Sequence, residues 1–274
     1  MKYKAIHIQC DDELAETISF LLQEMGYEGT SYENDILIAY CDSNLLDRSA
    51  LDQLLIPFQL VPIKITDVPL QNWNKLWEKN FKSADLGEHI HSRAPFHPPK
   101  LVKHDIIILP KMAFGTGHHE TTQLSAIALE KIDCSDKTVL DMGCGSGLLA
   151  ILASQKGAKH IFAIDYDDNC IQNTLENIQL NKVKNVEVIK DNSLQQIQGK
   201  LDIIVSNIVK NINLHLLPEF AEKIKTNGTL ILCGFIAEDE AILIQKAHEY
   251  GFKLINKNIK KSWLQTQFIK HHVD

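Results

Sequence analysis

From residue 133 onward, short apolar runs alternate with helix-like stretches. Between the helix-like stretches, such as "GLLAILASQKG" and "DDNCIQNTLENIQLN", lie five runs: "KTVLDMG", "HIFAIDY", "VEVIKDN", "LDIIVSNI" and "GTLILCGF". This alternation predicts a parallel sheet with helices on both faces. The end of the chain breaks the pattern, because only a short turn separates "FKLINKNIK" from "WLQTQFIKHH". These two strands should be antiparallel, since a parallel return needs a crossover.

The first 66 residues form a different pattern, with the predicted order βαββαβ. "KYKAIHIQC" alternates like a strand, "DELAETISFLLQEMG" and "SNLLDRSALDQLL" are amphipathic helices, and "GTSYE", "ILIAYC" and "FQLVPIKITDV" are further strands. This is the order of the ferredoxin-like split βαβ arrangement. Asp11 or Asp12 is predicted to cap the start of the first helix, and Gly26 to end it. Asn34-Asp35 is a turn-forming pair between two strands. Ser43 or Asn44 is predicted to start the second helix.

Residues 67–102 are predicted to connect this small α+β domain to a larger domain at 103–274. "QNWNKLWEKNFKS" places Trp73 and Trp77 four residues apart on one helical face, followed by Phe81, which favours packing against a domain. "APFHPPK" has the composition of an extended, semi-rigid spacer.

A glycine-rich turn follows the first apolar run of the larger domain. Gly143, Gly145 and Gly147 form G-x-G-x-G, and Leu148 stands where a dinucleotide-binding loop would need its third glycine. A pyrophosphate requires the positive end of a helix, whereas this loop can let its backbone approach an uncharged nucleoside. Asp165 ends the next run, eighteen residues after Gly147, where a carboxylate can accept both ribose hydroxyls.

The glycine turn, the acid and the final hairpin together resemble the class I S-adenosylmethionine-dependent methyltransferases. Their Rossmann-like sheet has seven strands, with the seventh inserted antiparallel beside the fifth, and the five parallel strands plus the hairpin match this. Within that resemblance Asp191 can reach an adenine amino group or serve as a solvated turn residue. Asp141 can fix the glycine turn or reach the donor's amino group through water. Cys144 is interpreted as a small buried thiol, because no histidine spacing supports a catalytic dyad.

The fourth run ends at Asn207, at the predicted mouth of the site. Methyltransferases that act on planar nitrogens resemble one another in carrying Asn/Asp-Pro-Pro-Tyr here, but this chain has Asn207-Ile208-Val209-Lys210. A planar acceptor is therefore disfavoured, and an aliphatic amine, whose lone pair attacks without rehybridisation, fits better.

A second motif precedes the larger domain. The segment "AFGTGHHETT", with "GCGSG" and "SNI", resembles the family of methyltransferases that modify large-subunit ribosomal protein eleven. The resemblance covers essentially the whole chain and implies an N-terminal ferredoxin-like substrate-recognition domain, a linker helix and a class I catalytic domain. The family motif A-F-G-T-G-x-H-x-T-T is matched in full by Ala113, Phe114, Gly115, Thr116, Gly117, His119, Thr121 and Thr122.

This resemblance implies a site and a reaction. It carries cofactor contacts to Thr122, Gly143, Asp165 and Asn207, to which we add Gly145, and it makes the glycine-rich motif a lid over S-adenosyl-L-methionine. Thr116, His119 and Asn207 are the residues expected to line the amine entrance. The implied enzyme is a protein N-methyltransferase that acts on lysine ε-amines and the N-terminal α-amine of the ribosomal protein, by in-line displacement without a dedicated general base.

Two other functional classes stay open: a class I methyltransferase acting on RNA or a small-molecule amine, and a non-catalytic adaptor that retains the fold. The formal charge of −7 argues against a general nucleic-acid binder. His118, His119 and Glu120 lack the second histidine of H-E-x-x-H, so no metal is expected. Six scattered cysteines, no signal segment and no apolar span predict a cytoplasmic protein without a membrane anchor, which we expect to be a monomer.

Overall fold

The computed structural model describes residues 3–68, 82–111 and 115–271. The chain divides into two compact units, Met1–Asn80 and Phe81–Asp274, which are described separately. The predicted helix with Trp73, Trp77 and Phe81 lies outside the described residues, and so do Ala113 and Phe114 of the glycine-rich motif.

The first unit has the element order βαββαβ that the hydrophobic pattern predicts. All strand pairs of its four-stranded sheet are antiparallel, in the order β2-β3-β1-β4. The elements are β1 (Tyr3–Gln9), α1 (Asp12–Glu24), β2 (Gly29–Glu33), β3 (Ile36–Asp42), α2 (Arg48–Leu55), the short 3₁₀ helix η1 (Ile56–Phe58) and β4 (Pro62–Val68). Strand β1 contributes Ile6 and Ile8 to a core that Ile18 of α1 and Leu51 of α2 complete.

Local hydrogen bonds explain where the elements of this unit begin and end. The Asp11 carboxylate accepts from the Leu14 amide at 2.9 Å, which settles the choice of cap for α1. Gly26 ends that helix with a φ of +88°. Asn34 and Asp35 both have positive φ, the backbone of a tight hairpin turn.

The predicted start of the second helix at Ser43 or Asn44 is wrong. Helix α2 begins at Arg48, because the Asp47 carboxylate accepts from the amides of Ser49 and Ala50 at 2.9 and 3.1 Å. The Asp42 carboxylate instead accepts from the Asn44 amide at 2.8 Å, which holds residues 42–44 in a turn.

The second unit contains the predicted seven-stranded sheet, in the order β10-β9-β8-β11-β12-β14-β13. Five strands are parallel, and β14 lies antiparallel between β12 and β13. This confirms both the parallel sheet and the antiparallel hairpin. The strands are β8 (Thr138–Met142), β9 (His160–Asp165), β10 (Val186–Lys190), β11 (Leu201–Asn207), β12 (Ile224–Ile236), β13 (Phe252–Lys260) and β14 (Trp263–Lys270).

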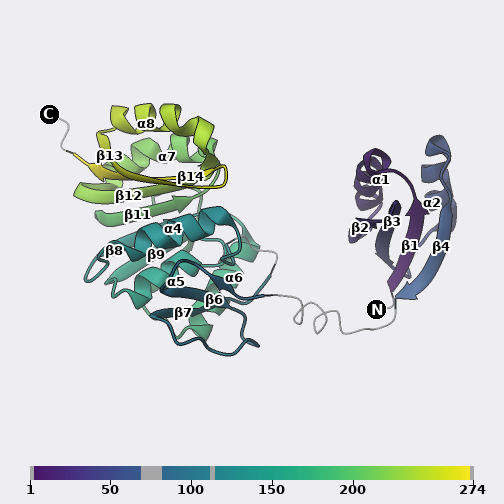
Figure 1. The fold of residues 1–274 in the computed structure, drawn as a ribbon, viewed down its shortest axis with the longest axis horizontal. Coiled ribbons are helices and arrows are strands. Elements are labelled where there is room, and N and C mark those ends of the chain that lie inside the picture. The colour runs from purple at the N-terminus through teal and green to yellow at the C-terminus, as the bar shows by residue number, and fades with distance from the viewer. Residues whose placement is uncertain (1–2, 69–81, 112–114, 272–274) are drawn as a thin grey trace. The chain divides into compact units, whose positions relative to one another are not determined.

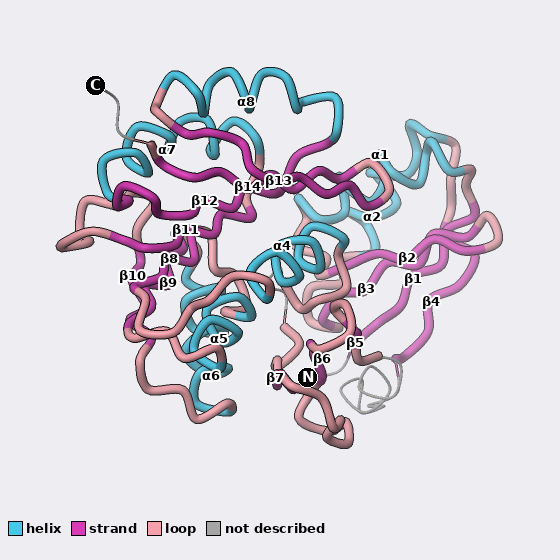
Figure 2. Tube along the Cα trace, turned by 60° about the vertical axis from the view of Figure 1, so that its left-hand side comes forward, coloured by secondary structure: helices cyan, strands magenta, loops and turns pink. Residues whose placement is uncertain are grey.

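Helices cover both faces of this sheet (Figures 1 and 2). One face packs α4 (Glu120–Glu130), α5 (Leu148–Gln155) and α6 (Asp168–Leu180); the other packs α7 (Lys210–Lys223) and α8 (Glu240–Glu249), which follows the short η2 (Ala237–Asp239). Successive strand residues belong to opposite cores: Val139 packs with α5, and Leu140 packs with α7. The near-continuous apolar strands in the sequence reflect this two-sided burial.

The Pro-rich stretch belongs to the second unit and is not a free spacer. A three-stranded sheet of β5 (Ala84–Asp85), β6 (Ile90–Arg93) and β7 (His104–Ile107) encloses it, and all four residues of β6 are buried. Arg93 donates to the Asp105 carboxylate at 2.7 Å and to the His97 carbonyl at 3.0 Å. These bonds fold the segment back on itself, and the two compact units divide between Asn80 and Phe81, within the predicted linker of residues 67–102.

Two asparagines of α6 and the asparagine that caps its C-terminal end, spaced four residues apart, attach the chain that leads to the glycine-rich motif. Asn181 accepts from the Ile107 amide at 2.9 Å and donates to its carbonyl at 2.6 Å. Asn177 accepts from the Leu109 amide at 2.7 Å, and Asn173 donates to the Leu109 carbonyl at 3.1 Å. The spacing places the three side chains on the same side. Their carboxamides pair with the backbone amide and carbonyl groups of Ile107 and Leu109, much as the backbone of a neighbouring strand would.

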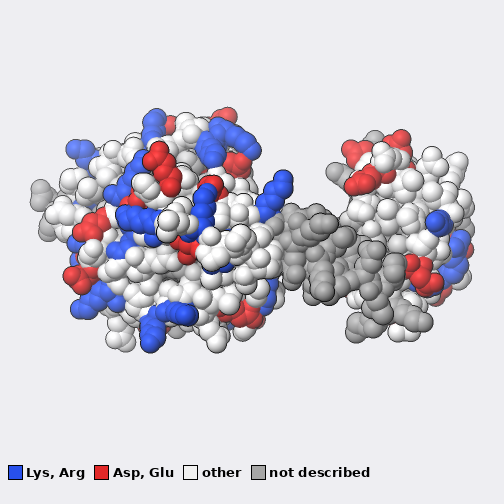
Figure 3. Space-filling model, turned by 60° about the horizontal axis from the view of Figure 1, so that its bottom comes forward, with Lys and Arg blue, Asp and Glu red and all other residues white. Residues whose placement is uncertain are grey.

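The surface of the second unit carries charges of both signs. On the face shown in Figure 3, Lys and Arg side chains are interspersed with Asp and Glu. Within the described parts of the chain, no helix combines the length and the apolar character that crossing a membrane requires. Five of the six cysteines are buried, and Cys170 is half-buried.

Candidate active site

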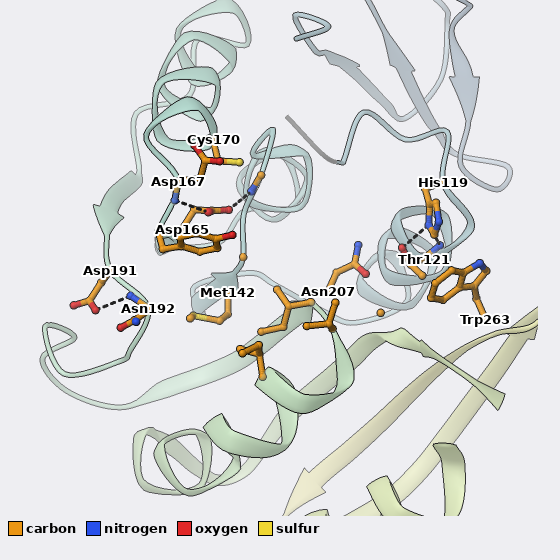
Figure 4. A pocket seen from close by; sticks show the side chains of 17 residues that line it. His119, Thr121, Met142, Asp165, Asp167, Cys170, Asp191, Asn192, Asn207 and Trp263 are labelled. Atoms are coloured by element: carbon orange, nitrogen blue, oxygen red, sulfur yellow. Dashed lines mark hydrogen bonds between the residues drawn. The ribbon is translucent and has the colours of Figure 1, made fainter. Parts of the chain in front are cut away.

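A cavity of about 690 Å³ opens where the parallel strands end (Figure 4). Met142 ends β8, Asp165 ends β9 and Asn207 ends β11, and all three line the cavity. In open parallel sheets this edge, beside the reversal of strand order, is where ligands bind. Figure 4 shows Asp165, Asp167 and Asp191 toward one end, Asn207 in the middle, and His119, Thr121 and Trp263 toward the other.

Asp165 stands at the acidic end with capacity to accept further hydrogen bonds. Its Oδ2 accepts from the Gly145 amide at 3.0 Å, and its Oδ1 accepts from the Asp167 amide at 3.1 Å. A carboxylate has about four lone-pair sites, so each oxygen can still accept one hydroxyl. Both bonds fix the carboxylate where the sequence placed the ribose acid.

Asp191 is held by its own turn. Oδ1 accepts from the amides of Asn192 and Ser193 at 2.7 and 3.0 Å, and Oδ2 accepts from the Gln196 amide nitrogen at 2.6 Å. Partial burial acts to raise the pKa of Asp191, but these hydrogen bonds outweigh it and hold the pKa below its usual value. The residue lines the cavity and also organises the turn after β10.

The glycine turn is fixed by buried side chains of neighbouring elements. Thr174 donates to the Gly145 carbonyl at 2.9 Å, and Asn177 donates to the Ser146 carbonyl at 2.8 Å. Cys144 lies beside Thr174, and burial raises the pKa of its thiol well above the usual value. A neutral, buried thiol agrees with the interpretation of Cys144 as a packing residue.

Asp141 is the buried acid behind this turn. Its Oδ2 accepts from the Ala150 amide in the first turn of α5 at 3.0 Å, and its Oδ1 has no hydrogen-bond partner in the described parts of the chain. Burial, with a smaller effect of the Asp165 charge, raises the pKa of Asp141 to about 7. The first of the two predicted roles, fixing the glycine turn, is therefore visible in the Ala150 bond.

The other end of the cavity combines amide, hydroxyl and aromatic groups. His119 caps α4, since its Nδ1 accepts from the Thr121 amide at 3.2 Å. Its ring meets the edge of Trp263, with centroids 4.9 Å apart. The Oδ1 of Asn207 is buried and, among the described residues, has no hydrogen-bond partner. This oxygen is an unused acceptor at the cavity wall.

Two of the predicted site residues lie elsewhere. Thr122 is buried but does not line the cavity; its neighbour Thr121 does. The two threonines are adjacent in α4, and successive helical residues point about 100° apart, so their side chains meet different surroundings. Thr116 is also absent from the lining, and its hydroxyl bonds His118 Nδ1 at 3.0 Å.

The glycine-rich motif lies against the glycine turn and β6. Ser146 donates to the Gly115 carbonyl at 2.8 Å, and Ser92 donates to the Thr116 carbonyl at 2.8 Å. Gln123 donates to the Gly117 carbonyl at 3.1 Å. Two glycine-rich segments are thus joined directly, although the bonded residues Gly115 and Ser146 lie 31 positions apart; of the motif, His119 and Thr121 line the cavity.

Sequence reasoning did not select Trp263 or Thr121. A signal existed for Trp263, because it begins a strand that runs antiparallel to the parallel set. The first residue of that strand must lie at the edge where the parallel strands end. For Thr121, the sequence offered only a choice between two adjacent threonines.

The sheet order, the glycine turn after β8 and the acid ending β9 define a class I methyltransferase fold. The model of the family "Ribosomal protein L11 methyltransferase (PrmA)" matches residues 38–271. The chain belongs to this family of methyltransferases.

Individual relatives agree with that assignment. A ribosomal protein L11 methyltransferase of Phocaeicola vulgatus is 35% identical over 268 residues, 95% of each chain. One of Porphyromonas gingivalis is 38% identical over 260 residues, 92% of this chain and 90% of its own. A crystal structure of a ribosomal protein L11 methylase from Lactobacillus delbrueckii subsp. bulgaricus is 29% identical. It matches with a TM-score of 0.65, covering 70% of this chain and 100% of its own.

Proposed function

We propose that this enzyme transfers methyl groups from S-adenosyl-L-methionine to amines of ribosomal protein L11, namely lysine ε-amines and the N-terminal α-amine. The observation that carries the proposal is a single cavity with a ribose-type acid at one end and the unused Asn207 oxygen farther along. Relatives that align along nearly the whole chain are named ribosomal protein L11 methyltransferases, which supports the choice of acceptor.

The residues around the cavity suit this donor. Asp165 retains lone pairs for two ribose hydroxyls, and Gly143 and Gly145 leave room for a nucleoside against the backbone. Asp141 is buried behind the glycine turn and does not line the cavity, and its unpartnered oxygen is an acceptor that an ammonium group can satisfy through water. When bound, S-adenosyl-L-methionine supplies an activated methyl group on a positively charged sulfur.

The acceptor end is built for an aliphatic amine. Asn207 can accept an N–H of the incoming nitrogen, while Ile208 and Val209 of the next two positions line the cavity with apolar groups. Lysine has an ordinary pKa of about 10.4, so it must lose a proton before it can attack. Apolar surroundings lower that pKa because they disfavour the charged form. The protein's main task is then alignment, worth up to roughly 7–11 kcal/mol in favourable systems.

The first unit is the proposed docking module for L11, in line with the resemblance of its sequence pattern to a substrate-recognition domain. It has a core of its own, so it can present a binding surface without contributing to the cavity. A ribosomal protein as the acceptor supports the cytoplasm as its location.

The test is methyl transfer from tritiated S-adenosyl-L-methionine to ribosomal components of cells that lack this enzyme. The products are separated into protein and RNA fractions, and L11 is then analysed by mass spectrometry. We expect label in L11, at lysines and at the N-terminal amine. Label confined to RNA, or to a small amine, would replace the proposal with the alternative methyltransferase class. Absence of donor binding in calorimetry would favour the non-catalytic adaptor.

A further inference from the structure

The segment that carries Asn207 into the cavity is held from behind by one buried asparagine. Residues 207–209 join β11 to α7, and Asn213 of α7 is fully buried behind them. Asn213 Nδ2 donates to the Ile208 carbonyl at 2.8 Å and to the Cys233 carbonyl of β12 at 3.0 Å. Its Oδ1 accepts from the Ser206 hydroxyl at 2.7 Å. The carboxamide therefore ties the segment to the strands on both sides of it.

Close packing against two glycines confines the backbone and side chain of Ile208. A Cβ on Gly143 would overlap Cγ2 of Ile208, and a Cβ on Gly234 would stand 2.6 Å from the Ile208 carbonyl carbon. Ile208 is thus lodged between the glycine turn and the end of β12. Both contacts need a residue without a side chain, and both glycines have positive φ.

Asn213 itself does not line the cavity, so it acts through its neighbours. It fixes the Ile208 carbonyl, one peptide away from Asn207, which lines the cavity and whose Oδ1 has no hydrogen-bond partner among the described residues. A small rotation of residues 207–209 would move the Asn207 side chain, whereas Asp165 and Gly145 are held by bonds of their own. The hydrogen bonds that hold residues 207–209 are thus distinct from those that hold Asp165 and Gly145, although Ile208 also packs against Gly143.

We infer that Asn213 is a positioning residue for the acceptor amine: it sets Asn207 and Ile208 at the mouth of the cavity, with the Ser206 hydroxyl orienting its carboxamide. This inference rests on the proposed function for its kinetic consequences. Its loss should lower kcat with little change in donor affinity, since misplacement by about 1 Å can cost on the order of 100-fold in rate. Repeated methylation needs realignment at each step, so partly methylated products should accumulate.

The test compares Asn213→Ala and the milder Ser206→Ala with a matched control, Asn185→Ala. The Asn185 side chain accepts from the Ser154 hydroxyl at 2.6 Å and donates to the Ala158 carbonyl at 2.6 Å, and it does not line the cavity. For each full-length variant we would measure the affinity for S-adenosylhomocysteine, kcat and KM with L11, and the number of methyl groups per site by mass spectrometry.

We expect Asn213→Ala to lower kcat roughly 10- to 100-fold. The KM for L11 and the affinity for S-adenosylhomocysteine should stay within about threefold of wild type. Ser206→Ala should show a smaller effect in the same direction, and it decides the question if Asn213→Ala does not fold. Asn185→Ala should keep the wild-type kcat and the wild-type number of methyl groups per site. Unchanged kcat in the folded position-213 variant, or an equal loss in the control, would overturn the inference.

Hydrogen exchange separates failure of this inference from failure of the proposed function. If wild-type enzyme does not methylate L11, the proposed function fails, and exchange of the amides of residues 207–212 becomes the deciding measurement. Faster exchange there in Asn213→Ala, with unchanged exchange at residues 143–147, supports the positioning role. Exchange equal to wild type in both segments rejects it.

Discussion

The Asp165 carboxylate accepts a hydrogen bond from the Gly145 amide at 3.0 Å, although twenty residues separate them in the sequence. The two residues follow neighbouring strands, β8 and β9, whose ends meet at the same edge of the sheet. The acid therefore has two tasks: it supports the glycine turn, and it retains lone pairs that face the cavity. A substitution of Asp165 that keeps an acceptor for the Gly145 amide but removes the negative charge should preserve the turn and weaken binding of the donor.

Asp165→Asn should weaken binding of S-adenosylhomocysteine by about 10- to 100-fold. The amide oxygen can still accept from one backbone amide, but a charged acceptor worth about 1.5–3 kcal/mol per hydrogen bond is lost. Titration calorimetry measures this directly. The matched control is Asp202→Asn, which removes a carboxylate bonded to the Thr138 amide at 2.9 Å at the opposite edge of the sheet. Equal affinity loss in both variants would contradict the assignment of Asp165 as a donor ligand.

Gly234→Ala should destabilise the enzyme and reduce methyl transfer, because its Cβ would overlap the Ile208 backbone. Gly199→Ala is the control: its φ of +85° is similar, but nothing lies within 4 Å of the added Cβ. The unfolding free energy of the control should fall only by the cost of a left-handed backbone at alanine, about 1–2 kcal/mol, and its activity should be unchanged. Urea unfolding and kcat with L11 check both variants. Equal loss of activity would mean that backbone strain, and not contact with Ile208, sets the requirement for glycine.

The sheet could be predicted because its strands are buried on both faces and its turns carry glycine or acids. The glycine turn and Asp165 fall at strand ends in the sequence itself, so their meeting follows from parallel topology. Prediction failed where a local hydrogen bond chose between similar residues. The carboxylate of Asp47, and not the side chain of Ser43 or Asn44, caps the start of α2.

Contacts between distant segments were also outside the reach of the sequence pattern. The composition of "APFHPPK" is that of an extended spacer, but Arg93 bonds across it to Asp105. Asn213 resembles any polar residue of an amphipathic helix, and only the placement of Ile208 and Cys233 around it reveals its three hydrogen bonds. Such residues become visible when the tertiary partners of each buried polar atom are known.

Deleting residues 1–66 should leave S-adenosylhomocysteine affinity within about twofold of wild type and abolish methylation of L11. The reason is that every described residue that lines the cavity lies in the second unit, while the deleted part has its own core. Calorimetry and mass spectrometry of L11 provide the two readouts. Substantial methylation of L11 by the shortened enzyme would show that the first unit is not the docking module.

Asp141→Asn should remove a pH dependence of stability in the ligand-free enzyme. Folding raises the pKa of Asp141 from 3.8 to about 7, chiefly through burial. The folded state therefore binds more protons than the unfolded state between these values. The resulting stabilisation is full below the unfolded pKa and is lost as the pH rises through about 7. Because asparagine does not titrate, the unfolding free energy of wild type relative to the variant should fall by up to about 1.4 kcal/mol per pH unit in this window. Urea unfolding from about pH 5 to about pH 8 tests this. Parallel pH profiles for the two proteins would show that Asp141 is ionised throughout, and that its unpartnered oxygen carries its charge before any donor binds.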